Sequence, residues 1–153
     1  MSRSTLAALS TLSAACCLAG IAAAPTAAAA APEQARLAGC EFGRIAGTYD
    51  YADFGAHVSG MREVTVGDFR DQFEQAQPTI QAELAANHTR AEVNSVDCRV
   101  VSGDANQADV TLTVVQTTTS DATAGLPKTN KLSLLVTVVN VDGRWLVNRA
   151  ETD

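Results

Sequence analysis

The densest group of residues able to do chemistry is a run of two tyrosines and two aspartates, Tyr49, Asp50, Tyr51 and Asp53. An aspartate and a tyrosine that face one apolar cavity can enolise a ketone, because the carboxylate takes the proton and the phenol stabilises the oxyanion. The alternative is structural: the run ends a helix, and its tyrosines pack on the edge of a sheet. Spacing alone places neither group in a pocket, so it favours the structural interpretation.

The two histidines, His57 and His88, have no nucleophile paired with them in the sequence. His57 lies near Asp50 and Asp53, where a general acid–base role is conceivable. Without a paired nucleophile we instead expect it at the surface. The sequence has no Gly-rich phosphate loop, no His-x-x-x-His pair and no nucleophile elbow. It therefore predicts a non-enzymatic protein without catalytic residues, metal ligands or a cofactor.

The mature chain has one pair of cysteines, Cys40 and Cys98, which stand 58 positions apart. In an oxidising compartment the pair predicts a disulfide, which would stabilise the fold by about 4 kcal/mol on a chain-entropy model. Two separate buried thiols are the alternative. A zinc site is disfavoured, because no histidine stands near either cysteine.

The first 31 residues have the layout of a secretory signal peptide. A short start with Arg3 precedes an apolar stretch over residues 5–24, and small residues with Ala-x-Ala options follow up to Ala31. The apolar stretch is also long enough to act as a weak, uncleaved membrane anchor. The sequence thus predicts an exported protein in which residues 32–153 form one domain.

The charge of the chain excludes some classes of partner. The formal net charge is −6, and Arg3 is the only charged residue of the leader, so the remaining domain is more acidic still. Nucleic acid needs a basic face, and simple docking on anionic lipid does too. We expect neither nucleic acid nor a lipid surface as a direct electrostatic partner.

Two helices are predicted at the start of the mature domain. Over residues 32–49, apolar side chains lie on one helical face, and three glycines at spacings of four predict close packing of that helix. Residues 49–60 are predicted as a helical turn followed by a loop. A second helix is predicted from Thr65, as its N-cap, to about residue 86, with a buried stripe of Phe69, Phe73, Ala76, Ile80 and Leu84.

After residue 90 the apolar period changes from about 3.6 to 2 residues, which predicts four strands. The strands centre on 96–100, 108–114, 132–138 and 145–147, and Asp142-Gly143 is a two-residue hairpin turn between the last two. Apolar residues on both faces of the third strand predict that it is central and covered on both sides. The order predicts an α+β fold with N-terminal helices packed on a curved four-stranded antiparallel sheet.

Four segments in this order resemble the Mce-associated proteins of actinobacteria, where Mce stands for mammalian cell entry. They are Thr48–Tyr51, Val66–Phe73, Ala108–Leu112 and Val139–Val147, and the resemblance spans about residues 35–152. It implies a nuclear transport factor 2-like, or cystatin-like, roll. Members usually retain a transmembrane helix with a charged cytoplasmic tail, so the short leader here leaves membrane anchoring open.

The resemblance also implies a function and partners. It points to an exported accessory protein of the cell envelope that assists lipid import, with envelope proteins such as Mce transporter subunits as partners. No catalytic residues come with it. The alternatives are a small-molecule binder or isomerase-like enzyme on the same roll, holding an apolar ligand near Tyr49, Asp50, Tyr51 and Asp53, and a secreted protein that acts alone.

Overall fold

The computed structural model describes residues 31–152, so the predicted leader, with its cleavage site and anchor alternative, lies outside the described residues. No helix within that range is long and apolar enough to cross a membrane. The elements in chain order are α1 (Glu33–Ala46), β1 (Tyr49–Asp50), η1 (Tyr51–Asp53), α2 (Phe54–Val64), α3 (Gly67–Ala86), β2 (Arg90–Gly103), β3 (Gln107–Thr119), η2 (Asp121–Thr123), β4 (Lys128–Val141) and β5 (Arg144–Thr152).

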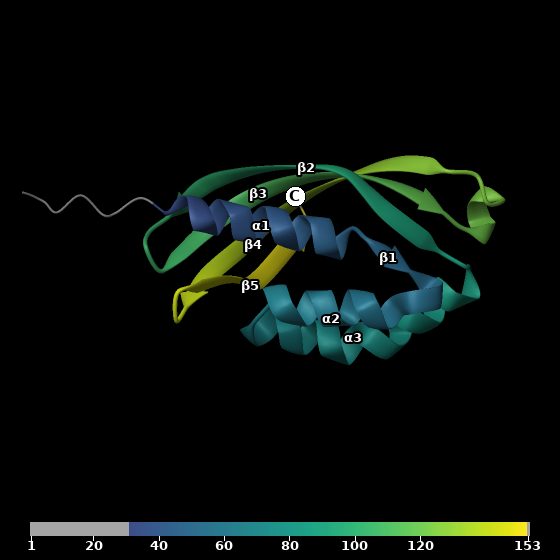
Figure 1. Ribbon diagram of the computed structural model, residues 1–153, viewed down its shortest axis with the longest axis horizontal. Coiled ribbons are helices and arrows are strands. Elements are labelled where there is room, and N and C mark those ends of the chain that lie inside the picture. The colour runs from purple at the N-terminus through teal and green to yellow at the C-terminus, as the bar shows by residue number, and fades with distance from the viewer. Residues whose placement is uncertain (1–30, 153) are drawn as a thin grey trace, which may run out of the picture.

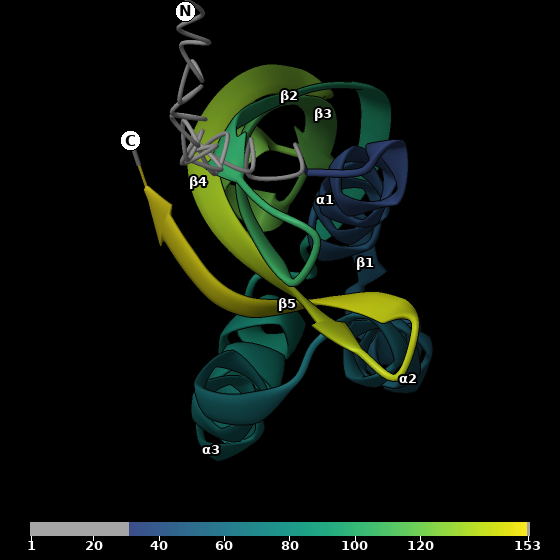
Figure 2. The same ribbon diagram turned by 90° about the vertical axis from the view of Figure 1, so that its left-hand side faces the viewer.

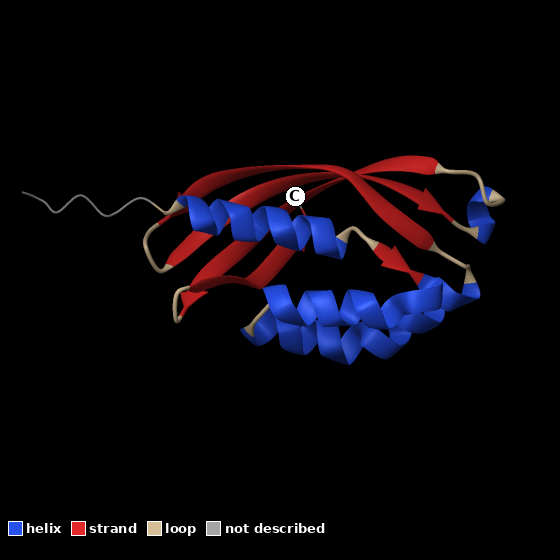
Figure 3. Ribbon diagram, viewed as in Figure 1, coloured by secondary structure: helices blue, strands red, loops and turns tan. Residues whose placement is uncertain are grey.

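The strands form one antiparallel sheet in the order β1-β2-β3-β4-β5. The sheet curves around α1, and α2 and α3 run side by side next to β5 (Figures 1, 2 and 3). The α+β prediction is confirmed, but the sheet has five strands rather than four. The additional strand, β1, pairs only with Arg90 and Ala91 of β2, and two residues are too few to show an alternating pattern.

Helix α1 lies unusually close to the sheet. A Cβ atom on Gly39 would stand 2.9 Å from Val110 Cγ1, and one on Gly47 would stand 2.6 Å from Val93 Cγ2. Only glycine allows this approach, which places Phe42 at the centre of the core with 2% of its surface exposed. The close packing predicted from the glycine spacing is therefore present.

Helix α2 was not predicted, since residues 49–60 were assigned to a helical turn followed by a loop. Its apolar residues Phe54, Val58 and Met61 follow a helical spacing of four and three, and all three are at most 4% exposed. Gly55 and Gly60 weaken the local helix propensity, so burial of this face stabilises the helix.

The prediction that Thr65 caps the next helix is wrong. Thr65 is fully buried beyond the end of α2, and its hydroxyl donates a hydrogen bond to the Met61 carbonyl. Helix α3 begins at Gly67, whose φ of +57° suits glycine. Of the predicted stripe on α3, Phe73 is buried and three residues are half-buried, but Ala76 is exposed.

The strands are longer than predicted, at 14 residues for β2, 13 for β3 and 14 for β4. Strand β4 lies between β3 and β5, yet the prediction that both its faces are covered is wrong, because the helices lie on the concave face and Val141 is 39% exposed. At the predicted hairpin turn Asp142 and Gly143 both have positive φ, at +52° and +85°, as a type I′ turn requires.

Candidate functional site

A pocket of about 640 Å³ lies where α1 ends and β1 and α2 begin, against β2 and β3. We call it the Tyr49 pocket. Its lining is partly apolar, from Ile45, Tyr49, Ala56 and Ala91, and partly charged, from Arg44, Asp50, Asp53, Arg90 and Glu92. Three of the four residues that the sequence singled out, Tyr49, Asp50 and Asp53, line this pocket, and Tyr51 does not.

The pairing of β1 with β2 places the first two of these residues. Tyr49 stands opposite Ala91, and Asp50 stands opposite Arg90. Tyr49 and Asp50 both line the pocket, and the chain turns into η1 immediately after them. Tyr51 is the first residue of η1 and packs on the other side, against His88.

The Tyr49 phenol lies in a largely buried environment. Its ring packs edge-on against His57 at a centroid distance of 5.8 Å. Burial raises the pKa of Tyr49, and a hydrogen bond with the Gln116 side chain partly opposes that rise. Gln116 is 5% exposed, and its Oε1 has no hydrogen-bond partner among residues 31–152.

His57 is half-buried rather than at the surface, where we expected it. Its ring stacks on Phe54 at 5.5 Å, and its Nδ1 lies 2.9 Å from the Thr48 carbonyl oxygen. Burial lowers the pKa of His57, while hydrogen bonds to the carbonyls of Thr48 and Ile45 act in the opposite direction. At neutral pH the ring is thus neutral, and its Nδ1–H donates a hydrogen bond to the Thr48 carbonyl, just after α1.

Both aspartates of the pocket cap helices. Asp50 Oδ1 accepts a hydrogen bond from the Ala52 amide at 2.8 Å and another from Arg90 Nε at 3.1 Å. Asp53 Oδ1 accepts from the Ala56 amide at 3.4 Å, at the start of α2. A base that enolises a ketone would be a carboxylate held toward an apolar cavity. Here the carboxylates are exposed and bonded to the backbone instead, and neither forms a pair with Tyr49.

A second group of polar residues, which we call the Tyr51 cluster, lies next to the pocket and shares Arg90 with it. His88 Nδ1 stands 2.7 Å from Asp121 Oδ2, and the His88 ring packs edge-on against Tyr51 at 5.0 Å. The Arg90 guanidinium lies 5.1 Å from the centre of the Tyr51 ring. The cluster joins η1, the loop after α3 and η2 at one end of the molecule.

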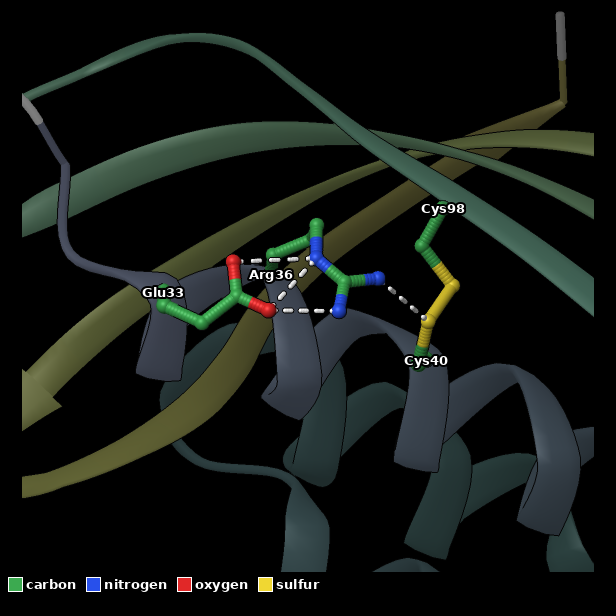
Figure 4. Close-up of polar contacts among 4 residues, drawn as sticks. All are labelled: Glu33, Arg36, Cys40 and Cys98. Carbon is green, nitrogen blue, oxygen red and sulfur yellow. Dashed lines mark hydrogen bonds and ion pairs between the residues drawn. A yellow bond between two sulfur atoms is a disulfide. The ribbon is translucent and has the colours of Figure 1, made fainter.

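The predicted cysteine pair is bonded. Cys40 of α1 and Cys98 of β2 form a disulfide with their Cα atoms 5.7 Å apart. Figure 4 shows it beside Arg36, whose guanidinium bonds Glu33 with its Nε, at 3.0 Å from Oε1, and approaches Cys40 Sγ at 3.7 Å with its Nη1. The disulfide links α1 to β2, whose first residues line the Tyr49 pocket.

Sequence reasoning missed the pocket residues that come from distant elements. Arg90 stands 40 positions from Asp50, and Gln116 lies on β3. Only the pairing of the strands brings Arg90 and Gln116 near the tyrosines, and no local spacing in the sequence indicates this proximity. No group of three or more potential metal ligands lies together in the described part of the chain.

Comparison with known proteins supports the fold. No family model matches the chain, and no curated protein does. Among solved structures it is similar to an Ntf2-like protein involved in plasmid conjugation, with a TM-score of 0.54, 16% identity, and coverage of 79% of this chain but only 48% of the other.

Two further structures match at higher TM-scores. An IcmL-like type IV secretion system protein from Legionella pneumophila has a TM-score of 0.58 at 11% identity, covering 80% of this chain and 94% of that one. CagV from Helicobacter pylori, a VirB8 homolog of a type IV secretion system, has a TM-score of 0.58 at 13% identity, covering 80% and 98%. The fold is therefore nuclear transport factor 2-like, as the resemblance implied. None of these matches supports the Mce-associated family.

Proposed function

We propose that this chain is an exported, non-enzymatic accessory protein of the cell envelope that acts by binding another protein. One observation carries the proposal: the groups of the Tyr49 pocket that could act as acid or base in the enolisation, two aspartates and a histidine, are already engaged within the chain. Asp50 and Asp53 cap helices, and His57 bonds the Thr48 carbonyl. A pocket of this kind offers shape and apolar surface rather than a reactive pair of groups.

Three further observations support an extracytoplasmic role. The disulfide is typical of oxidising compartments. The leader has the layout of an export signal. Two of the similar structures belong to type IV secretion systems. The partner is then a subunit of an envelope assembly of secretion or transport. Mce transporter subunits are one candidate partner, on the strength of the sequence resemblance alone.

The test is site-specific photocrosslinking in the protein's own host. A photoreactive amino acid replaces Ala56, which lines the Tyr49 pocket, or Ala82, which is exposed on α3 as a matched control. We expect a discrete adduct with an envelope protein from position 56 and not from position 82. Absence of the adduct, or recovery of the chain from the cytoplasm, would contradict the proposal.

A small apolar ligand is a second candidate occupant, because the pocket volume lies within the range of about 300–1,000 Å³ that ligand sites have. Native mass spectrometry of protein isolated from its host would detect such a ligand. Replacing Ala56 by Trp should expel it by filling the pocket. Turnover of a ketone that Asp50→Asn abolishes would instead support an isomerase and overturn the non-enzymatic proposal.

A further inference from the structure

The outer edge of β2 carries no neighbouring strand over most of its length. Strand β1 covers only Arg90 and Ala91, and between Glu92 and Gly103 no other backbone segment of residues 31–152 bonds to that edge. The opposite edge of the sheet is partly covered, since the Val66 amide donates to the Val147 carbonyl at 2.9 Å. Unpaired N–H and C=O groups along an edge strand are a template for another strand.

Two β-bulges set the length over which β2 could pair regularly with an added strand. Its register with β3 shifts between Val93 and Ser95 and again between Val100 and Ser102. Bulges twist a strand and interrupt its hydrogen-bond pattern. The regular stretch is therefore 95–100, and its middle lies next to Cys98.

The charges within this stretch are self-complementary. Asp97 and Arg99 flank Cys98, both are exposed, and neither forms an ion pair with another residue in the described part of the chain. If two copies of β2 pair antiparallel about Cys98, each Asp97 stands opposite the other copy's Arg99 on the outer face of the sheet. Opposite charges at directly facing positions stabilise a strand pair.

Neighbouring registers bring like charges together. Centring the pair on Asp97 places the two Asp97 side chains opposite each other, and centring it on Arg99 does the same for the arginines. Like charges at directly opposed positions destabilise a strand pair. Larger shifts extend the pairing beyond the bulges. The bulges therefore limit the shift, and the charges select the register centred on Cys98.

Exposed apolar side chains accompany this edge. Leu37 on α1 is 51% exposed, and Val101 at the second bulge is 57% exposed. Leu37 lines a groove of about 550 Å³ between α1 and β2, together with Cys40 and Val96. In the register centred on Cys98, Val96 of one copy stands opposite Val100 of the other on the concave face. A second copy would therefore bring apolar side chains to this groove.

We propose that two copies of this chain associate through their β2 edges, antiparallel and centred on Cys98, so that the two five-stranded sheets become one continuous sheet. The inference is independent of the function proposed above. The pairing is short, and the surface that it covers contains few apolar side chains, so the dimer forms at micromolar or higher concentration and not as an obligate unit.

Sedimentation equilibrium of the exported protein over a range of concentrations tests the proposal. Asp97→Arg or Arg99→Asp alone converts two attractive pairs into two repulsive ones, so each should weaken dimerisation about tenfold or more. The double variant D97R/R99D restores the complementarity and should restore the dimer. Arg149→Asp makes the same charge change as Arg99→Asp at an exposed site on β5, at the opposite edge of the sheet. This control should leave dimerisation unchanged.

Amide hydrogen exchange locates the interface independently. We expect protection that increases with protein concentration in the stretch 95–101 and at no other strand. A protein that stays monomeric at every concentration would overturn the proposal. So would a dimer that survives both single charge reversals, or one whose concentration-dependent protection lies elsewhere.

Discussion

Two tyrosines that stand two positions apart each place their ring against a histidine, and their surroundings differ. The Tyr49 and His57 rings lie inside the pocket, where Gln116 and the Thr48 carbonyl are their polar partners. The Tyr51 and His88 rings lie outside the pocket, where Arg90 contacts Tyr51 and Asp121 contacts His88. The same pair of residue types therefore lines a pocket at one site and belongs to the Tyr51 cluster at the other.

The contrast shows that the position of a histidine in the fold, more than its neighbours in sequence, determines its chemistry. His57 is near two aspartates in sequence, yet its ring contacts a carbonyl and aromatic rings. His88 stands four positions from Glu92, yet its carboxylate partner, Asp121, is 33 positions away. Four sets of variants measure how far the two sites differ.

The largest difference is expected between Tyr49→Ala and Tyr51→Ala. Removing the Tyr49 ring opens a cavity beside His57, so the free energy of unfolding should fall by about 2–3 kcal/mol. Removing the Tyr51 ring, which packs against the exposed residues His88 and Arg90, should cost less than about 1 kcal/mol. Urea denaturation measures both changes. Equal losses would show that the two sites do not differ in packing.

The next largest difference is expected between two glycines that flank the tyrosines. A Cβ on Gly47 would stand 2.6 Å from Val93 Cγ2, so Gly47→Ala should destabilise the fold by about 1–2 kcal/mol by pushing the Tyr49 segment away from β2. Gly55→Ala in α2 meets no atom closer than 4.0 Å and should stabilise by about 0.5–1 kcal/mol. The melting temperatures should move in opposite directions, and a shift of the same sign in both would refute this reasoning.

The pH dependence of stability should report the burial of His57. The pKa of His57 is lower in the folded protein than its ordinary value of 6.5, so below that value the unfolded chain takes up the proton more readily. Stability from His57 is therefore complete above pH 6.5 and is lost as the pH falls below it. The carboxylates with lowered pKa values, Glu33, Glu41 and Asp104, act only near and below their ordinary values of 4.5 for Glu and 3.8 for Asp.

Thermal melts between about pH 7 and 5 isolate this effect. His57→Gln should flatten the decline in melting temperature that wild-type protein shows on acidification over this window. A slope that His57→Gln leaves unchanged would mean that another group causes the decline.

The smallest effect on stability is expected in the Tyr51 cluster. The side chains of His88 and Asp121 are 57% and 63% exposed, so solvent screens their attraction. Asp121→Asn should change the free energy of unfolding by at most about 0.5 kcal/mol, and the change should shrink further in 1 M salt. A larger, salt-independent loss would indicate that Asp121 mainly holds the η2 turn.

Much of the fold could be predicted, because an element that buries one face has apolar residues at a regular spacing in the sequence. The alternation from Ala108 to Val114 marks β3, and its inward residues are at most 1% exposed. Such a spacing also exists in α2, at Phe54, Val58 and Met61, but Gly55 and Gly60 within it favoured a loop. Strand β1 could not be predicted, since its two residues gain their structure from β2 alone.

The pocket was harder to predict than the fold. The sequence indicated Tyr49, Asp50 and Asp53, yet what each residue does depends on contacts that the fold brings from far along the chain. Arg90 reaches Asp50 only through the β1–β2 register, and Gln116 reaches Tyr49 only because β3 faces α1. Local spacing carries no information about either contact.

The disulfide has a consequence for how the protein bears force. A pull on the two ends of the folded domain passes from Cys40 directly to Cys98, so the 58-position segment between them is shielded. That segment includes α2, α3 and most of the Tyr49 pocket lining. Reduction of the bond would add about 200 Å of extensible chain, at about 3.5 Å per residue. In its oxidised form the domain can lose β3, β4 and β5 under load while this loop stays covalently closed.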